Sequence, residues 1–214
     1  EIGWCDWSSD VCSSDLGYGA VIDSDVVFDD LGLPFIPARR VKGCLREVAV
    51  ANAGVFGEVL PGVDHAAVAA CFGVSGLSES APLVIESMQL DEAVSLRHWL
   101  SWCAALKPDL GNRSSVLGQY CEIRRRTAID SETGTAEAHS LRSARLVRKG
   151  HIFRGEVRFR EEHLDLLVLA VHGWRGIGTS RTRGFGELTA CLLDEHGKEI
   201  GKETIQKLEA VCAR

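Results

Sequence analysis

The stretch Gly176-Ile-Gly-Thr-Ser-Arg181-Thr-Arg183-Gly-Phe-Gly186 carries the strongest signal in this sequence. Two Gly-x-Gly pairs enclose five residues, and two of those five are arginines. Glycine lets a ligand approach the main chain closely, because it has no Cβ and tolerates positive φ. Guanidinium groups bind phosphate oxygens through paired hydrogen bonds. The loop therefore predicts a binding site for the phosphates of RNA.

The segments on either side of this loop decide the fold. An apolar, helix-like run (163–174) precedes it, and a strand-like run (187–193) follows it. A dinucleotide-binding fingerprint needs the opposite order, strand and then helix, and a Walker loop needs Gly-Lys-Ser/Thr. Both of these common nucleotide sites are therefore excluded at this position.

Periodicity and turn residues predict the remaining elements of an α+β domain. The pattern indicates strands at 25–29, 83–90 and 187–193, a hairpin of 143–149 with 152–159, and helices at 39–53, 64–71, 91–106 and 161–172. Residues 107–142 are polar and rich in turn signals, so we expect them to be irregular and functional or disordered.

The first sixteen residues look foreign to the domain. Asp6 to Leu16 resembles a translated sequencing adapter, so we leave 1–16 out of the fold reasoning, as one does for a tag. The formal net charge then moves from −6 to −2, because four acidic residues are removed and 26 remain against 24 basic ones. Residues 17–214 suit a single domain, and no apolar run is long enough for a membrane helix.

Basic residues gather on the predicted helix at 39–53. Its apolar positions fall on one face, so the helix can bury that face and present cations from the other. These cations are candidates for binding RNA phosphates; ordinary solvation of a charged surface is the alternative interpretation. The four positions are Arg39, Arg40, Lys42 and Arg46.

Cysteine and histidine spacing does not suggest a metal centre. The eight cysteines include no Cys-x-x-Cys pair, and the seven histidines are scattered. This pattern is typical of reduced thiols in a cytoplasmic protein.

Three blocks of sequence together resemble the RAMP superfamily of CRISPR proteins. The first block runs from Ile22-Asp23-Ser through Gly32-Leu-Pro-Phe-Ile-Pro to Arg39-Arg-Val-Lys-Gly43. The second runs from Arg126 to Ala136 and leads into 150–155, and the third is the glycine-rich loop. The family usually has Gly-Ser-Ser where this chain has Ala-Arg-Arg after Ile-Pro.

The resemblance covers most of residues 17–191 and implies a fold. The family has a ferredoxin-like, RRM-like core with a glycine-rich loop between its last helix and last strand. Here it implies such a core with an inserted thumb or hairpin region around 107–160. The family's first strand should precede Gly17, where this sequence has the adapter-like segment, so we expect the native first strand to be lacking.

The resemblance also implies a function. It is similar to the crRNA-binding backbone subunits of type III effector complexes, whose partners are crRNA, complementary target RNA and other CRISPR effector subunits. Such a protein is expected in the cytoplasm, with no membrane as a partner. In target-cleaving members, an Asp matching Asp23 promotes cleavage of guide-paired RNA with Mg2+ or another divalent cation. The RNA-binding candidates are Arg39, Arg40, Lys42, Arg46, Gly176, Gly178, Arg181, Arg183, Gly184 and Gly186.

Two alternatives stay open at this point. Asp23 can instead cap a turn, in which case the chain is a structural guide-binding subunit without catalysis. The chain can also be a crRNA-processing endonuclease of the same superfamily, which shares the ferredoxin-like fold and the glycine-rich loop. Those enzymes commonly use a histidine near the N-terminus, and His65 is the first histidine here.

Overall fold

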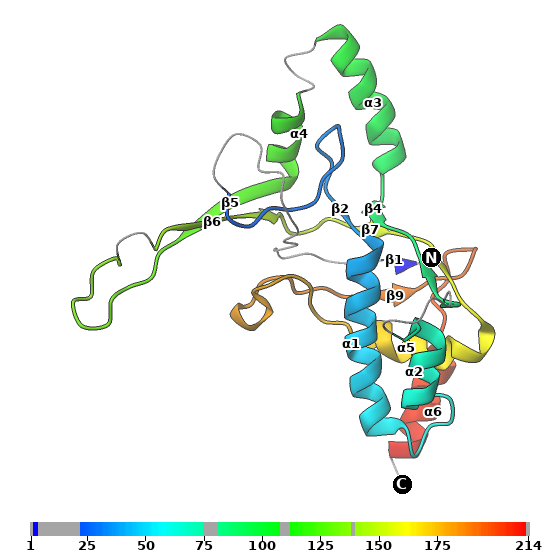
Figure 1. Cartoon of the computed structure of the whole chain (residues 1–214). Helices are drawn as coiled ribbons and strands as arrows, with labels where there is room; N and C mark the ends of the chain where they lie inside the picture. Colours follow the sequence, from blue (N-terminus) through cyan, green and yellow to red (C-terminus); the bar gives the residue numbers. More distant parts are fainter. Residues whose placement is uncertain (1, 4–21, 75–80, 108–111, 138–139, 213–214) are drawn as a thin grey trace.

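The computed structural model describes residues 2–3, 22–74, 81–107, 112–137 and 140–212. Short antiparallel strands and six α-helices make up an α+β fold in this part of the chain (Figure 1). In chain order the elements are β1 (Ile2–Gly3), β2 (Phe35–Ile36), α1 (Ala38–Phe56), α2 (His65–Phe72), β3 (Val84–Ile85), β4 (Met88–Leu90), α3 (Ala93–Leu106), α4 (Arg113–Tyr120), β5 (Cys121–Arg126), β6 (Arg142–Val147), β7 (Phe153–Arg154), β8 (Val157–Arg158), the 3-10 turn η1 (Glu161–His163), α5 (Leu164–Gly173), the 3-10 turn η2 (Arg181–Arg183), β9 (Cys191–Leu192) and α6 (Lys202–Cys212).

Two helices form the centre of the core. Helix α1 buries one stripe of side chains at a spacing of four residues and packs against α5 and α2. Helix α5 is almost wholly apolar, and six consecutive residues (166–171) are buried. The predicted helices at 39–53 and 64–71 are confirmed within a few residues, and Asp64 caps α2 by accepting from the Ala67 amide.

The predicted strand at 83–90 is divided into two strands. Strand β3 pairs with β8, whereas β4 lies between β2 and β7 in a three-stranded sheet. Gly155 lies between the two partner strands, and a Cβ on it would come within 3.1 Å of the Met88 side chain. The break therefore lets one strand-like segment pair with two partners in succession.

The predicted pairing of 143–149 with 152–159 is wrong. Strand β6 pairs instead with β5, in a register that places Cys121 opposite Val147 and Arg126 opposite Arg142. The expected irregular region thus contains α4 and β5, with Asn112 capping α4 through the Ser115 amide. The β5–β6 hairpin projects from the body of the molecule (Figure 1).

Smaller corrections concern element ends. The predicted strand at 25–29 forms only isolated bridges, through Ser24 and Phe28. Glu92 rather than Asp91 precedes α3, and the last strand shortens to β9. Helix α6 was not predicted.

The N-terminal segment is described only at Ile2–Gly3, which pair antiparallel with β9. The rest of the adapter-like stretch lies outside the described residues. Within the described ranges, none of the helices has the length and apolar character that crossing a membrane requires.

Candidate nucleic-acid interface

The glycine-rich loop is an ordered turn between α5 and β9. Its two arms are joined where the Ile177 amide donates to the Gly186 carbonyl at 2.9 Å. Three of its glycines have positive φ, at +99° for Gly178, +75° for Gly184 and +73° for Gly186. These backbone conformations are strained for residues with a Cβ, so the glycines permit the path of the loop. Gly176 is placed at its base, where its carbonyl accepts from the Trp174 indole at 3.0 Å.

The loop and the first half of α1 together line a pocket of about 370 Å³. Pro37, just before α1, lines the pocket. Helix α1 contributes the exposed Arg39, the partly buried Arg40 and Gly43. Gly178 and Arg181 come from the loop. The structure therefore brings together four of the predicted RNA-binding residues, from segments about 140 positions apart in the sequence.

Arg181 has a carboxylate partner in this pocket. Its two terminal nitrogens donate to the two carboxylate oxygens of Glu47 on α1, each at 3.2 Å. This paired hydrogen bond raises the pKa of Arg181, and both side chains are about half exposed. A phosphate bound to Arg181 must therefore compete with Glu47, and the competition takes place in solvent, where such pairs are weak.

The other predicted RNA-binding residues do not line this pocket. Lys42 donates from Nζ to the Leu83 carbonyl at 3.1 Å and so lies toward β3. Arg46 and Arg183 are exposed on α1 and in η2. Gly184 is exposed, and Gly186 is buried at the foot of the loop.

Strand β5 also contacts the glycine-rich loop, although the sequence indicated a basic cluster there and no strand. The guanidinium carbon of Arg126 lies 4.2 Å from the ring centroid of Phe185, and that of Arg124 lies 5.4 Å from it. Arg126 also donates to Ser180 Oγ at 3.5 Å. The glycine-rich loop is therefore tied to the hairpin by cation–π contacts. The run of three arginines at 124–126 was the available signal.

Asp23 is held against the other strand of the hairpin. Its Oδ2 accepts from the Ser143 amide at 2.7 Å and from the Ser143 hydroxyl at 3.2 Å, while Arg142 lies 3.7 Å from Oδ1. The amide hydrogen bond is the main cause that lowers the pKa of Asp23. One carboxylate oxygen is thus fixed, and the other faces an exposed guanidinium.

The next acidic residue secures the same segment. Both oxygens of Asp25 accept from Arg145 at 2.8 Å, and these two side chains are only 11% and 12% exposed. Arg145 also lies near Phe28 on the wall of a recess of about 940 Å³ between this segment, α4 and the hairpin. The Asp25–Arg145 pair therefore anchors the segment that carries Asp23.

Asp23 is the candidate protein ligand for a divalent cation at this interface. Among the described residues, no cluster of three or more His, Cys, Asp or Glu side chains is present. Mg2+ commonly uses one or two carboxylates, substrate phosphates and water. Asp23 fits that donor set as a single protein ligand.

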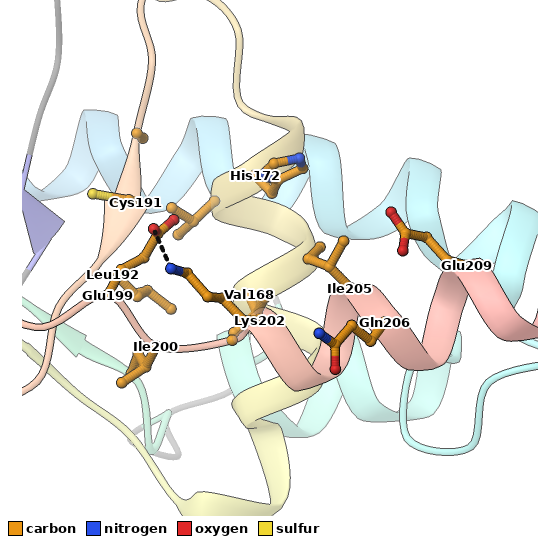
Figure 2. Close-up of a pocket in the computed structure, with 13 residues that line it drawn as sticks. Val168, His172, Cys191, Leu192, Glu199, Ile200, Lys202, Ile205, Gln206 and Glu209 are labelled. Atoms are coloured by element: carbon orange, nitrogen blue, oxygen red, sulfur yellow. Dashed lines mark ion pairs between the residues drawn. The ribbon is translucent and has the colours of Figure 1, made fainter.

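A further pocket lies between α5, β9 and α6 (Figure 2). Apolar side chains such as Val168 and Ile205 form much of its lining, and Lys202 pairs with Glu199 at 3.9 Å. It shares no lining residue with the pocket at Arg181. Its mixed, mostly apolar lining does not match a phosphate site.

Comparison with solved structures identifies the fold. The fold matches a chain of the type III-B Cmr-beta bound to cognate target RNA, solved by cryo-EM (TM-score 0.60, 14% identity, covering 88% of this chain and 95% of that one). It also matches a chain of type III-B Cmr-beta in the apo state (TM-score 0.64, 13% identity, covering 91% and 97%). The ferredoxin-like α+β class expected from the sequence is therefore confirmed.

The family follows from the sequence itself. The model of the RAMP superfamily matches residues 16–189, and this chain belongs to that superfamily. The family resemblance found in the three sequence blocks is thereby confirmed. A search of curated proteins found no match.

Proposed function

We propose that this chain is a crRNA-binding subunit of a type III CRISPR RNA-guided interference complex. The observation that carries the proposal is the pocket at which Arg39, Arg40, Gly178 and Arg181 converge in a chain of the RAMP superfamily. Its partners are crRNA, complementary target RNA and other effector subunits, and it acts in the cytoplasm. Contacts to the phosphate backbone hold any guide sequence equally, and base pairing provides the specificity.

When the guide binds, Arg181 exchanges the Glu47 carboxylate for a phosphate of the RNA. Without RNA, Glu47 occupies the two donors of the guanidinium. A phosphate offers the same paired geometry with more negative charge, and Arg39 and Arg40 add attraction at the other side of the pocket. The guide backbone then replaces the Glu47 carboxylate, which turns toward solvent.

Target cleavage at Asp23 is the second part of the proposal. The fixed Oδ2 sets the orientation of the carboxylate, and Oδ1, which lies 3.7 Å from the exposed Arg142, is the oxygen that contacts the substrate. In that position Asp23 orients the 2′-hydroxyl of the target RNA for attack on the adjacent phosphate. The 2′-oxygen bonds to phosphorus while the P–O5′ bond breaks, water takes up the 2′-hydroxyl proton and returns one to the leaving 5′-oxygen, and the products are a 2′,3′-cyclic phosphate and a 5′-hydroxyl. The exposed Arg142 stabilises the negative charge that develops on the phosphate oxygens. A divalent cation, when bound by Asp23, supplies further charge neutralisation at the same phosphate.

Guide binding is tested by titrating labelled crRNA with the chain and its variants. We expect Arg39→Ala and Arg181→Ala each to weaken binding about tenfold, which corresponds to one charge-assisted contact. The slope of log K against log salt should fall by roughly 0.7 for each lost contact to single-stranded RNA. Glu47→Gln should strengthen binding, because the competing carboxylate is removed.

The matched control for these variants is Arg158→Ala. Arg158 is 69% exposed and pairs with a glutamate, as Arg181 does, but it lies on β8. Equal loss of affinity in Arg158→Ala and Arg181→Ala would mean that general positive charge, and not this pocket, binds the guide.

Cleavage is tested in the assembled complex with end-labelled complementary RNA and Mg2+. We expect regularly spaced cuts that disappear in Asp23→Ala, while target binding is retained and the exposed-carboxylate control Asp30→Ala still cuts. Binding without cuts in the unaltered chain would reject catalysis and leave the structural guide-binding subunit. Cleavage of crRNA precursor without a target would instead favour the processing endonuclease.

A further inference from the structure

Helix α3 exposes an apolar stripe that the RNA-binding proposal does not use. Trp99 is 58% exposed, and Trp102 and Leu106 are each 62% exposed. With Ser95 these residues follow the spacing i, i+4, i+7 and i+11, which places them on one face of the helix. Val94, at 69% exposed, borders the stripe. We call these five positions the α3 stripe.

The helix itself is firmly attached on its opposite side. Ala93 and Leu100 are buried, and Leu96 packs on the core. Arg97 donates to Asp29 at 3.0 Å and to Gln89 at 2.7 Å. The two exposed tryptophans are therefore carried on a fixed helix. Helix α3 lies at one end of the molecule (Figure 1).

The area of the α3 stripe suits the centre of a protein interface. An aromatic side chain buries about 150–250 Å² when it is fully covered, so each of these indoles leaves on the order of 100–150 Å² in water. With Leu106 and Val94 the stripe presents roughly 400 Å². A stable interface covers about 800 Å² on each partner, with a hydrophobic centre and a polar rim. The stripe can therefore supply the centre, and exposed Trp is the residue most typical of such centres.

The geometry points to a second copy of this chain as the partner. We infer that two α3 helices pack antiparallel about a twofold axis near residue 100. This arrangement sets large side chains against small or flat ones. Trp99 then lies opposite Trp102 of the second copy, and Ser95 lies opposite Leu106. Offset aromatic rings and large-against-small pairs both allow two helices to pack closely.

Charge at the two ends of the helix favours the antiparallel arrangement. Glu92 precedes the first turn of α3, and Lys107 follows its last turn; both are exposed. In the antiparallel pair each Glu92 lies beside Lys107 of the second copy, so the same attraction occurs at both ends. The helix dipoles also oppose one another favourably. A parallel pair would place like charges together at both ends.

The first test is sedimentation equilibrium of the full chain without RNA, over about 1–100 µM. We expect a monomer–dimer equilibrium within this range, with a dissociation constant at least tenfold weaker in Trp99→Ser and in Trp102→Ser. Both side chains are mostly exposed, so the circular dichroism spectrum should be unchanged, as should thermal unfolding at concentrations where the unaltered chain is monomeric. Val55→Ser, which alters a side chain 70% exposed near the end of α1, is the control and should leave the dimer unaffected.

Charge reversal tests the antiparallel arrangement. Glu92→Lys alone and Lys107→Glu alone should each weaken the dimer, because every dimer then contains two repulsive contacts. Mixing these two single variants should restore association, since each copy then supplies the charge that the other lacks. A chain that stays monomeric at 100 µM would overturn the inference, as would a dimer insensitive to the tryptophan variants. A monomer whose tryptophan variants lose another effector subunit would assign the stripe to that protein instead.

Discussion

The Asp25–Arg145 ion pair should determine how stably the segment that carries Asp23 is held against the β5–β6 hairpin. Arg145 donates to both Asp25 oxygens at 2.8 Å, and both side chains are nearly buried. Removing one member of a buried pair costs about 3–5 kcal/mol, because the other charge is left without compensation. Since these side chains retain some exposure, we discount the figure for solvent screening to about 2–4 kcal/mol for Asp25→Ala.

The assay is urea and thermal unfolding followed by circular dichroism. For a domain of this size, a loss of 3 kcal/mol lowers the melting temperature by about 6–12 °C. Asp30→Ala is the control, because Asp30 is an exposed acidic residue in the same segment, and it should change stability by less than about 0.5 kcal/mol. The double variant Asp25→Leu/Arg145→Met should be less destabilised than Asp25→Ala, since no buried charge remains.

The reasoning also predicts a functional effect of the same variant. Asp25→Ala should reduce target cleavage even though Asp23 is intact, because the carboxylate is no longer held at a fixed position. Equal stabilities of Asp25→Ala and Asp30→Ala would refute the claim that this pair anchors the segment. If Asp25→Leu/Arg145→Met loses as much free energy of unfolding as Asp25→Ala, the loss comes from altered packing and not from an unpaired buried charge.

Further predictions concern glycine geometry and pH. A Cβ at Gly32, where φ is +91°, would meet the Arg113 carbonyl oxygen at 2.4 Å, so Gly32→Ala should cost about 3 kcal/mol or more in unfolding experiments. Gly184 has φ of +75° and open space around a Cβ, so Gly184→Ala should cost only about 1 kcal/mol. The pKa of Asp23 is lowered in the folded chain, so its attachment to Ser143 is complete above the unfolded pKa and is lost as pH falls through the lower folded value. The protection of the Ser143 amide against hydrogen exchange, taken relative to its intrinsic exchange rate, should be complete at pH 5 and should be lost only as pH falls below the unfolded value of about 4; a loss of protection already at pH 6 would contradict the hydrogen bond to Asp23.

Local patterns identified the helices and the glycine-rich loop correctly. The four-residue spacing of apolar positions from Val41 to Ala53 determines which side of α1 is buried, and no distant contact is needed to see it. The same holds for the continuous apolar run of α5. The glycines of the loop were informative because positive φ is a property of single residues.

Pairing between distant segments could not be read in the same way. Strand β5 carries three consecutive arginines, and its exposed faces give no apolar alternation, so it resembled a loop. Gly150 suggested a local turn and hence the wrong partner for β6. The Glu47–Arg181 ion pair joins residues 134 positions apart, and nothing in either local sequence indicates it.

The tie between Asp23 and Ser143 has a consequence for how the protein is made. The two residues are 120 positions apart, and ribosomes add about 5–20 residues each second. Asp23 is therefore added to the chain roughly 6–24 seconds before the serine that holds it. During that interval the N-terminal segment has no hairpin to lie against, and its carboxylate cannot take its final orientation. The site of the proposed cleavage is thus completed late in synthesis, after most of the domain that surrounds it has been made.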